Sequence, residues 1–140
     1  MKKTILTLVT LFIASMFTAF SQQRPPFELR ENAEGVCDTV WTQPSGKVQF
    51  PGGTSDMMRF FKDNSKFSSE MVNINGSRRL TLKLLVDDSG KVIKTEIRTS
   101  LSPEFDEDAL NIVEKFPELT PAKEKGRAVC SYLVIPLQYK

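Results

Sequence analysis

The chain has 140 residues, of which 26% are charged and 40% are hydrophobic, which suits one domain with a modest core. It contains no histidine, so the commonest general base and the commonest metal ligand are missing. We therefore expect no catalytic residue, no metal, no cofactor and no small-molecule substrate. The basic residues are scattered among acidic ones rather than gathered in a stripe, which argues against a nucleic-acid partner.

The first 21 residues have the pattern of an export signal. Lys2 and Lys3 form a basic start, residues 5–20 are mostly apolar, and Ala19-Phe20-Ser21 offers small residues at the −3 and −1 positions of a signal-peptidase site. We predict cleavage after Ser21 and a periplasmic mature protein. The alternative is an uncleaved N-terminus anchored in the inner membrane, although the apolar run is short for a span of about 20 residues.

Residues 22–47 show no convincing hydrophobic period and contain several prolines and glycines, so they are predicted to form an extended N-terminal arm with one turn. Val40 and Trp41 are its main apolar point, and we expect Trp41 to cover exposed sheet or helix surface. Cys37 in this arm and Cys130 are the two cysteines of the chain. In an oxidising compartment they can form one disulfide; the alternative is two free thiols, with Cys130 acting as a small core residue.

Residues 48–140 carry the patterns of one α+β domain. A helix capped by Thr54 or Ser55 is predicted to run to about Asn64, followed by a polar loop over residues 65–77. Apolar residues then alternate along 80–86, which is typical of a half-buried strand. Asp87-Asp88-Ser89-Gly90 is predicted to form a turn, with Gly90 suited to a positive φ. In the return strand at 91–99 the apolar residues do not stay on one face, which indicates a bulge or a mostly exposed face.

A second helix is predicted to begin near Pro103, with Ser102 as its cap and early acidic residues that suit the positive helix N-terminus. Pro117 ends it. The last element, residues 127–139, alternates as a strand, and Pro136 places it at a sheet edge because proline cannot donate to a ladder. The sum is a three-stranded antiparallel sheet with two helices packed on one face. Cys130 is predicted to lie on the other face, so a disulfide would strap the arm across it.

Two local patterns have chemical alternatives that fit less well. Gly52-Gly53 lacks the following Lys-Ser/Thr of a phosphate-binding loop. Asp106-Glu107-Asp108 lacks the alternating acidic spacing and the trailing glutamate of a Ca²⁺ loop. The first pattern is better explained as the tight entry to a helix, and the second as a solvated helix start.

Five short motifs, taken in order, resemble the C-terminal domain of TonB-like energy-transducer proteins in the form common among Bacteroidetes. They are Phe50-Pro51-Gly52-Gly53, the Val-Asp-x-x-Gly-Lys-Val pattern at residues 86–92, the Phe-Asp-x-x-Ala-Leu pattern at residues 105–110, the set Pro117, Pro121 and Gly126, and the closing Ile135-Pro136. The aromatic-proline pair that usually follows the first helix is absent, as is the aromatic residue usually found between the two prolines. Both departures affect loops rather than the fold.

The resemblance implies a TonB/TolA C-terminal-like fold and a binding activity associated with transmembrane transport. Such domains pair an extended segment of an outer-membrane receptor, or of another envelope protein, against the edge of their sheet. The matching edge-strand positions here are Ala128, Val129, Cys130, Ser131, Tyr132, Leu133 and Val134. The alternative is that this is only the last core strand, with its edge capped by the chain's own arm.

Two further functions stay open at this point. A short membrane-anchored TonB-like energy transducer would keep its N-terminus, but the roughly 25 residues between Ser21 and Lys47 reach at most about 90 Å, which is short for an envelope-spanning linker. A structural or dimerising periplasmic domain would pair its exposed sheet edge with a second copy, as a homodimer. The predicted domains are thus a signal peptide at 1–21, an arm at 22–47 and a TonB C-terminal-like domain at 48–140.

Overall fold

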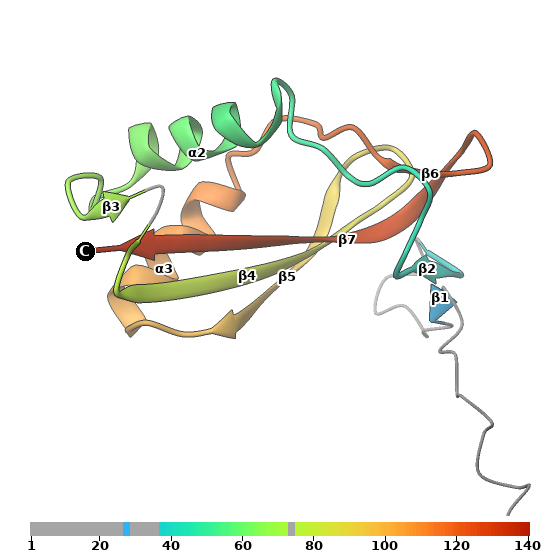
Figure 1. Ribbon diagram of the computed structural model, residues 1–140. Helices are drawn as coiled ribbons and strands as arrows, with labels where there is room; N and C mark the ends of the chain where they lie inside the picture. Colours follow the sequence, from blue (N-terminus) through green and yellow to red (C-terminus); the bar gives the residue numbers. More distant parts are fainter. Residues whose placement is uncertain (1–26, 29–36, 73–74) are drawn as a thin grey trace, which may run out of the picture.

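Figure 1 shows the computed structural model of the protein, which describes residues 27–28, 37–72 and 75–140. The predicted signal and much of the predicted arm fall outside these ranges. Within them, no helix combines the length and the apolar character that crossing a membrane requires. The described elements are β1 (Phe27–Glu28), β2 (Val40–Trp41), α2 (Gly53–Asn64), β3 (Met71–Val72), β4 (Arg78–Val86), β5 (Val92–Thr99), α3 (Pro103–Val113), β6 (Ala122–Glu124) and β7 (Arg127–Tyr139).

The longest strand, β7, is the third strand in the order β1-β2-β7-β4-β5, and β2 pairs with only two of its residues. Its antiparallel partner β4 runs beside it from Arg78, opposite Tyr139, to Val86, opposite Ser131. β5 forms a hairpin with β4 on the far side, and the predicted bulge is present as a register shift between Leu85 and Val86. β4, β5 and β7 are the three strands that the sequence pattern predicts.

The predicted number of three strands is wrong, because the described sheet has seven. The four additional strands, β1, β2, β3 and β6, have only two or three residues each, too few to show an alternating pattern. β2, β3 and β6 form by pairing with β7, and β1 pairs with β2. The sheet is also not purely antiparallel, since β2 runs parallel to β7. The α+β class and the two helices agree with the prediction.

One face of the sheet carries the core. β4 directs Leu80, Leu82 and Leu84 to this face, all fully buried, and β7 directs Ile135 and Leu137 there. Both helices bury side chains in the same cluster, which is why their apolar residues repeat at helical spacing. These members are Met57 and Phe61 from α2 and Phe105, Ala109, Ile112 and Val113 from α3.

The entry to α2 differs in detail from the prediction. The residue that caps the helix is Gly52 rather than Thr54 or Ser55, and both Gly52 and Gly53 have a φ of 82°. A Cβ at Gly52 would also collide with the Asp56 side chain. A left-handed backbone of this kind suits glycine, so the Phe-Pro-Gly-Gly motif fixes how the chain enters α2.

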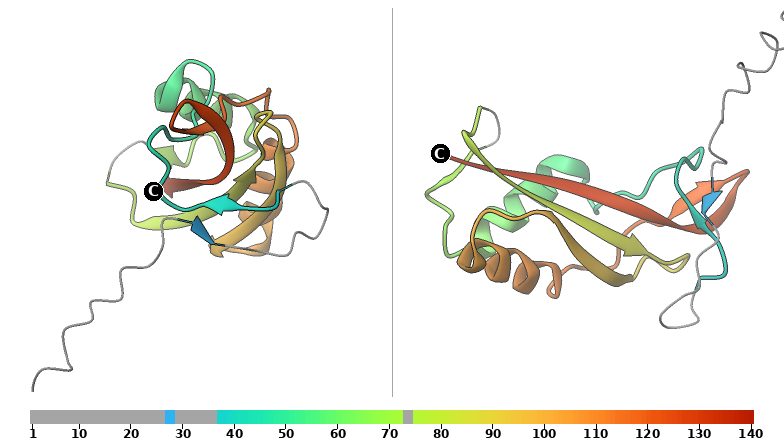
Figure 2. Two further views of the ribbon diagram at one scale, coloured as in Figure 1. Left: turned by 90° about the vertical axis from the view of Figure 1, so that its right-hand side faces the viewer. Right: turned by 90° about the horizontal axis from the view of Figure 1, so that it is seen from below.

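The end of the sheet farthest from the C-terminus is where distant parts of the chain meet. Figures 1 and 2 show β1, β2 and β6 gathered there around the first residues of β7. β6 forms a hairpin with β7, pairing Ala122 with Val129 and Glu124 with Arg127. β2 pairs Val40 with Cys130. The N-terminal arm is therefore part of the sheet.

Candidate functional site

The candidate site is the side of β7 that faces away from β4. Ser131 pairs with both β4 and β2, and Gln138 pairs with both β4 and β3. Because a strand has one neighbour on each side, β2 and β3 both lie on the side opposite to β4. Between them, the described strands pair Leu133–Leu137 with β4 alone. This stretch is named here the open edge.

The open edge has the chemistry of a surface that accepts another strand. No charged residue occurs in β7 from Ala128 to Tyr139. Among the described residues, Val134 is the large hydrophobic residue that is exposed, with 55% of its surface accessible. Pro136 has no N–H and is tolerated in a sheet where that position faces outward. Since orientation alternates along a strand, we infer that the N–H and C=O of Val134 also face outward.

A cleft of about 580 Å³ adjoins this edge. It is lined by Thr42, Gln43, Pro44, Lys47, Val48, Ser131, Tyr132, Leu133 and Val134. One wall is thus the chain that leaves β2, and the other is β7 itself. Lys47 is the charged member of this lining. An extended segment lying against Leu133 and Val134 would place side chains in this cleft.

The wall made by residues 42–48 is held in place by hydrogen bonds to β6 and the residues before it. The amides and carbonyls of Gly46 and Lys123 bond reciprocally at 2.8 Å, and those of Gln49 and Thr120 at 3.0 and 2.9 Å. The Ser45 amide donates to the Glu124 carboxylate at 2.8 Å. These contacts close the outer side of β6, so this wall is a fixed part of the fold.

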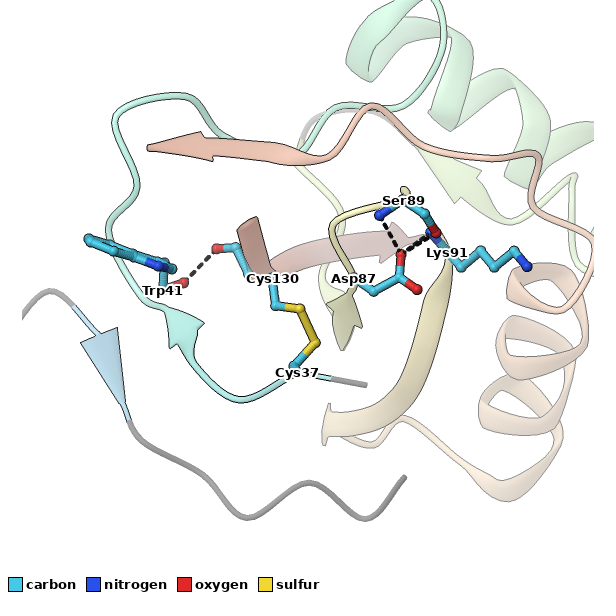
Figure 3. The surroundings of a disulfide bond; sticks show 7 residues. Cys37, Trp41, Asp87, Ser89, Lys91 and Cys130 are labelled. Carbon is cyan, nitrogen blue, oxygen red and sulfur yellow. Dashed lines mark hydrogen bonds between the residues drawn. A yellow bond between two sulfur atoms is a disulfide. The ribbon is translucent and has the colours of Figure 1, made fainter. Parts of the chain in front are cut away.

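The predicted disulfide between Cys37 and Cys130 is confirmed, and it anchors β2 beside β7. The two Cα atoms are 6.1 Å apart, and the side chains are 1% and 6% exposed. The Ser131 hydroxyl donates to the Trp41 carbonyl oxygen at 2.6 Å. Figure 3 shows the disulfide and this hydrogen bond on neighbouring parts of the two strands.

The predicted path of the arm is correct only in part. Cys37 and Cys130 do pack with Leu85, Ile93 and Tyr132, on the face of the sheet away from the helices. Val40 and Trp41, however, extend the sheet at its edge rather than crossing that face. An extended segment next to an unpaired edge gains backbone hydrogen bonds that a segment lying on side chains lacks.

The structure divides the predicted edge-strand residues into three groups. Ala128 and Val129 pair with β6, and Cys130 and Ser131 pair with β2. Tyr132, Leu133 and Val134 line the cleft, with the Lys83 ammonium 3.6 Å from the centre of the Tyr132 ring. Sequence reasoning missed the opposite wall at residues 42–48. No sequence signal marks this wall, because it lies more than 80 positions along the chain from the β7 residues 131–134 that line the cleft.

The acidic residues that could suggest chemistry have structural partners instead. Burial raises the pKa of Asp87, but hydrogen bonds from Ser89, Lys91 and Gly90 outweigh it and hold that pKa below its ordinary value. Figure 3 shows this carboxylate closing the turn between β4 and β5. Asp108 accepts from the Ser65 hydroxyl at 2.6 Å, which ties α3 to the end of α2. In the described ranges no three cysteine, aspartate or glutamate residues gather as a metal site would require.

Comparison with known proteins gives one family. The profile described as Gram-negative bacterial TonB protein C-terminal matches residues 69–140, which is just over half of the chain. The chain belongs to this TonB C-terminal family. No curated protein and no solved structure matches it significantly.

The family match gives the open edge a context. Domains of the TonB C-terminal family are non-enzymatic parts of envelope energy transducers and interact with outer-membrane receptors. The matched residues include β3, β4, β5, α3, β6 and the whole of β7. They leave out β2, Cys37 and the cleft wall at residues 42–48. The TonB-type domain of this protein therefore carries, next to its β7 edge, a disulfide-anchored segment that the family match does not cover.

Proposed function

We propose that this TonB-type protein is a non-enzymatic periplasmic interaction module. It binds an extended segment of an outer-membrane receptor or of another envelope protein by adding that segment as a strand to β7, in association with transmembrane transport. The observation that supports this most directly is the open edge, an uncharged stretch of β7 between β2 and β3 that borders a cleft. Main-chain hydrogen bonds supply the affinity and alternate side chains supply the selectivity.

The binding residues follow from the pairing of β7. Of the set predicted from the sequence, Tyr132, Leu133 and Val134 border the cleft, whereas Ala128, Val129, Cys130 and Ser131 already have a strand beside them. The proposed site is therefore centred on Leu133 and Val134 and continues to Leu137. It lies further along β7 than the sequence prediction placed it.

The proposal includes export and cleavage after Ser21, because the sequence of the first 21 residues has the pattern of a signal peptide. An anchored energy transducer would instead keep Met1. A dimerising domain would use the same edge to pair with a second copy, and its apparent mass would then rise with protein concentration.

The proposal is tested by titrating the isotope-labelled protein, residues 22–140, with synthetic peptides. The peptides cover the periplasm-facing segments of outer-membrane receptors from the same bacterium. We expect backbone amide signals of Leu133–Leu137 to shift for at least one peptide. In the Val134→Pro variant, binding should weaken about tenfold, because an outward N–H is lost and the proline ring opposes close approach of the added strand.

The matched control is Val134→Thr, which keeps the backbone N–H and the branched Cβ, and it should bind within about twofold of the wild-type protein. Shifts confined to β5 or to the helices would contradict the proposed site. Equal binding by the Val134→Pro variant and the wild-type protein would contradict strand addition.

A further inference from the structure

The open edge is bounded at both ends by strands of the same chain. β2 occupies the positions beside Cys130 and Ser131, and β3 occupies those beside Gln138 and Tyr139. Residues 133–137 of β7, the open edge, lie between them. At about 3.3 Å per residue this stretch is about 17 Å long, which is room for a strand of about five to six residues.

The end formed by β2 is held by a covalent bond. The Cys37–Cys130 disulfide fixes the chain just before β2, and the hydrogen bond from Ser131 to the Trp41 carbonyl fixes the end of β2. β2 runs parallel to β7, so its continuation would lead onto the open edge. The chain instead turns away over residues 42–44, which line the cleft. A bound strand would therefore meet this bend.

The end formed by β3 is also fixed. The Lys140 amide donates to the Glu70 carbonyl oxygen at 2.8 Å, which holds the start of β3 against the end of β7. Gly76 lies so close to β7 that a Cβ there would stand 2.7 Å from both the Gln138 Cβ and the Tyr139 oxygen. Its amide donates to the Gln138 side chain at 3.0 Å. The chain thus packs tightly around the last residues of β7.

We infer that β2 and β3 act as two stops, so that the open edge accepts an extended, uncharged segment of about six residues. The disulfide between Cys37 and Cys130 is the device that sets one of these limits, and this inference rests on the proposed function. Uncharged, β-branched residues are the expected chemistry, because the β7 side chains that would lie opposite them are uncharged and include the exposed Val134.

The test uses acetylated and amidated Thr-Val repeat peptides of four, six, eight and ten residues. Trp41 is the only tryptophan of the chain and lies at the β2 stop, so its fluorescence reports binding. For the wild-type protein we expect the affinity to rise about tenfold from four to six residues, because further backbone hydrogen bonds form. It should change by less than about twofold from six to ten residues.

Two variants remove or loosen the β2 stop. In Cys37→Ser/Cys130→Ser the anchor is lost, and in Ser131→Ala only the hydrogen bond to Trp41 is lost. For both we expect the affinity to keep rising from six to eight residues, by about fivefold in the first variant and about twofold in the second. Ser89→Ala, in the turn after β4, is the matched control and should keep the wild-type length dependence. If the double variant does not fold, the peptide-length series measured with the Ser131→Ala variant and with the wild-type protein tests the inference.

A wild-type affinity that rises as steeply from six to ten residues as from four to six would overturn the inference. So would an unchanged length limit in both variants that lack part of the anchor. If no repeat peptide and no receptor peptide shifts the amide signals of Leu133–Leu137, the proposed function itself fails. Binding of receptor peptides without any length limit would leave the proposed function intact and would contradict the inference that β2 and β3 act as stops.

Discussion

The edge strand β5 and the open edge of β7 differ in how they meet solvent. β5 places Lys94, Glu96 and Arg98 along its eight residues, and its register against β4 shifts at two points. Charged residues and bulges are common devices by which proteins keep an edge strand from pairing with another chain. β7 carries no charge from Ala128 to Tyr139. The comparison teaches that this sheet is protected on one edge and left able to pair on the other.

The two edges also differ in what the chain itself places beside them. β5 is paired by β4 alone in the described sheet, and its side chains Lys94 and Glu96 form an ion pair at 2.8 Å. β7 has short strands at both ends of its outer side and a cleft in between. The β5 edge is thus protected by its side chains, whereas the β7 edge is shortened by its own neighbouring segments.

The largest expected effect comes from removing the covalent anchor of β2. Cys37 and Cys130 are 93 positions apart, and a cross-link that closes a loop of this size restricts the unfolded chain strongly. We expect Cys37→Ser/Cys130→Ser to lower the free energy of unfolding by about 2–5 kcal/mol. Urea denaturation under non-reducing conditions measures this difference. The wild-type protein in reductant should approach the variant, and identical stability of all three would contradict the prediction.

An intermediate effect is expected when the protection of the β5 edge is removed. In Lys94→Thr/Glu96→Thr/Arg98→Thr, the edge becomes uncharged and keeps residues that favour strands. We expect the variant to associate as its concentration rises, which sedimentation velocity measures. The control Arg59→Gln/Lys62→Gln/Asp63→Asn removes the same net charge from exposed positions of α2 and should sediment as the wild-type protein does. Equal sedimentation of the two variants would contradict the claim that its charged residues protect the β5 edge from pairing.

The smallest expected effect concerns the cleft beside β7. Lys47 is exposed and is the charged residue among those lining this cleft, so a peptide with a carboxylate that flanks its paired, uncharged residues next to β2 would gain a weak ion pair. We expect Lys47→Ala to reduce the affinity for such a peptide about twofold, and less at high salt. Lys115→Ala, which changes another exposed lysine outside the cleft lining, is the control. A loss that does not depend on salt would contradict an electrostatic contribution.

Prediction from the sequence succeeded where a single segment carries its own pattern. The alternation of Leu80, Leu82 and Leu84 marks β4, and the helical spacing of Phe105, Ala109 and Ile112 marks α3. The positive φ of Gly90, 92°, follows from its place in a turn. Each of these features depends on residues that are neighbours in the chain, so the sequence shows them directly.

The sequence by itself determined the α+β class, the three long strands, the two helices and the disulfide pairing, since two cysteines allow one intramolecular bond. Only the tertiary structure decided that Val40 and Trp41 pair with β7 in parallel, and that residues 42–48 form a cleft with Leu133 and Val134. The physical reason is the range of the contacts. Strands of two or three residues have no period of their own, and they form because a long strand offers unpaired N–H and C=O groups beside them.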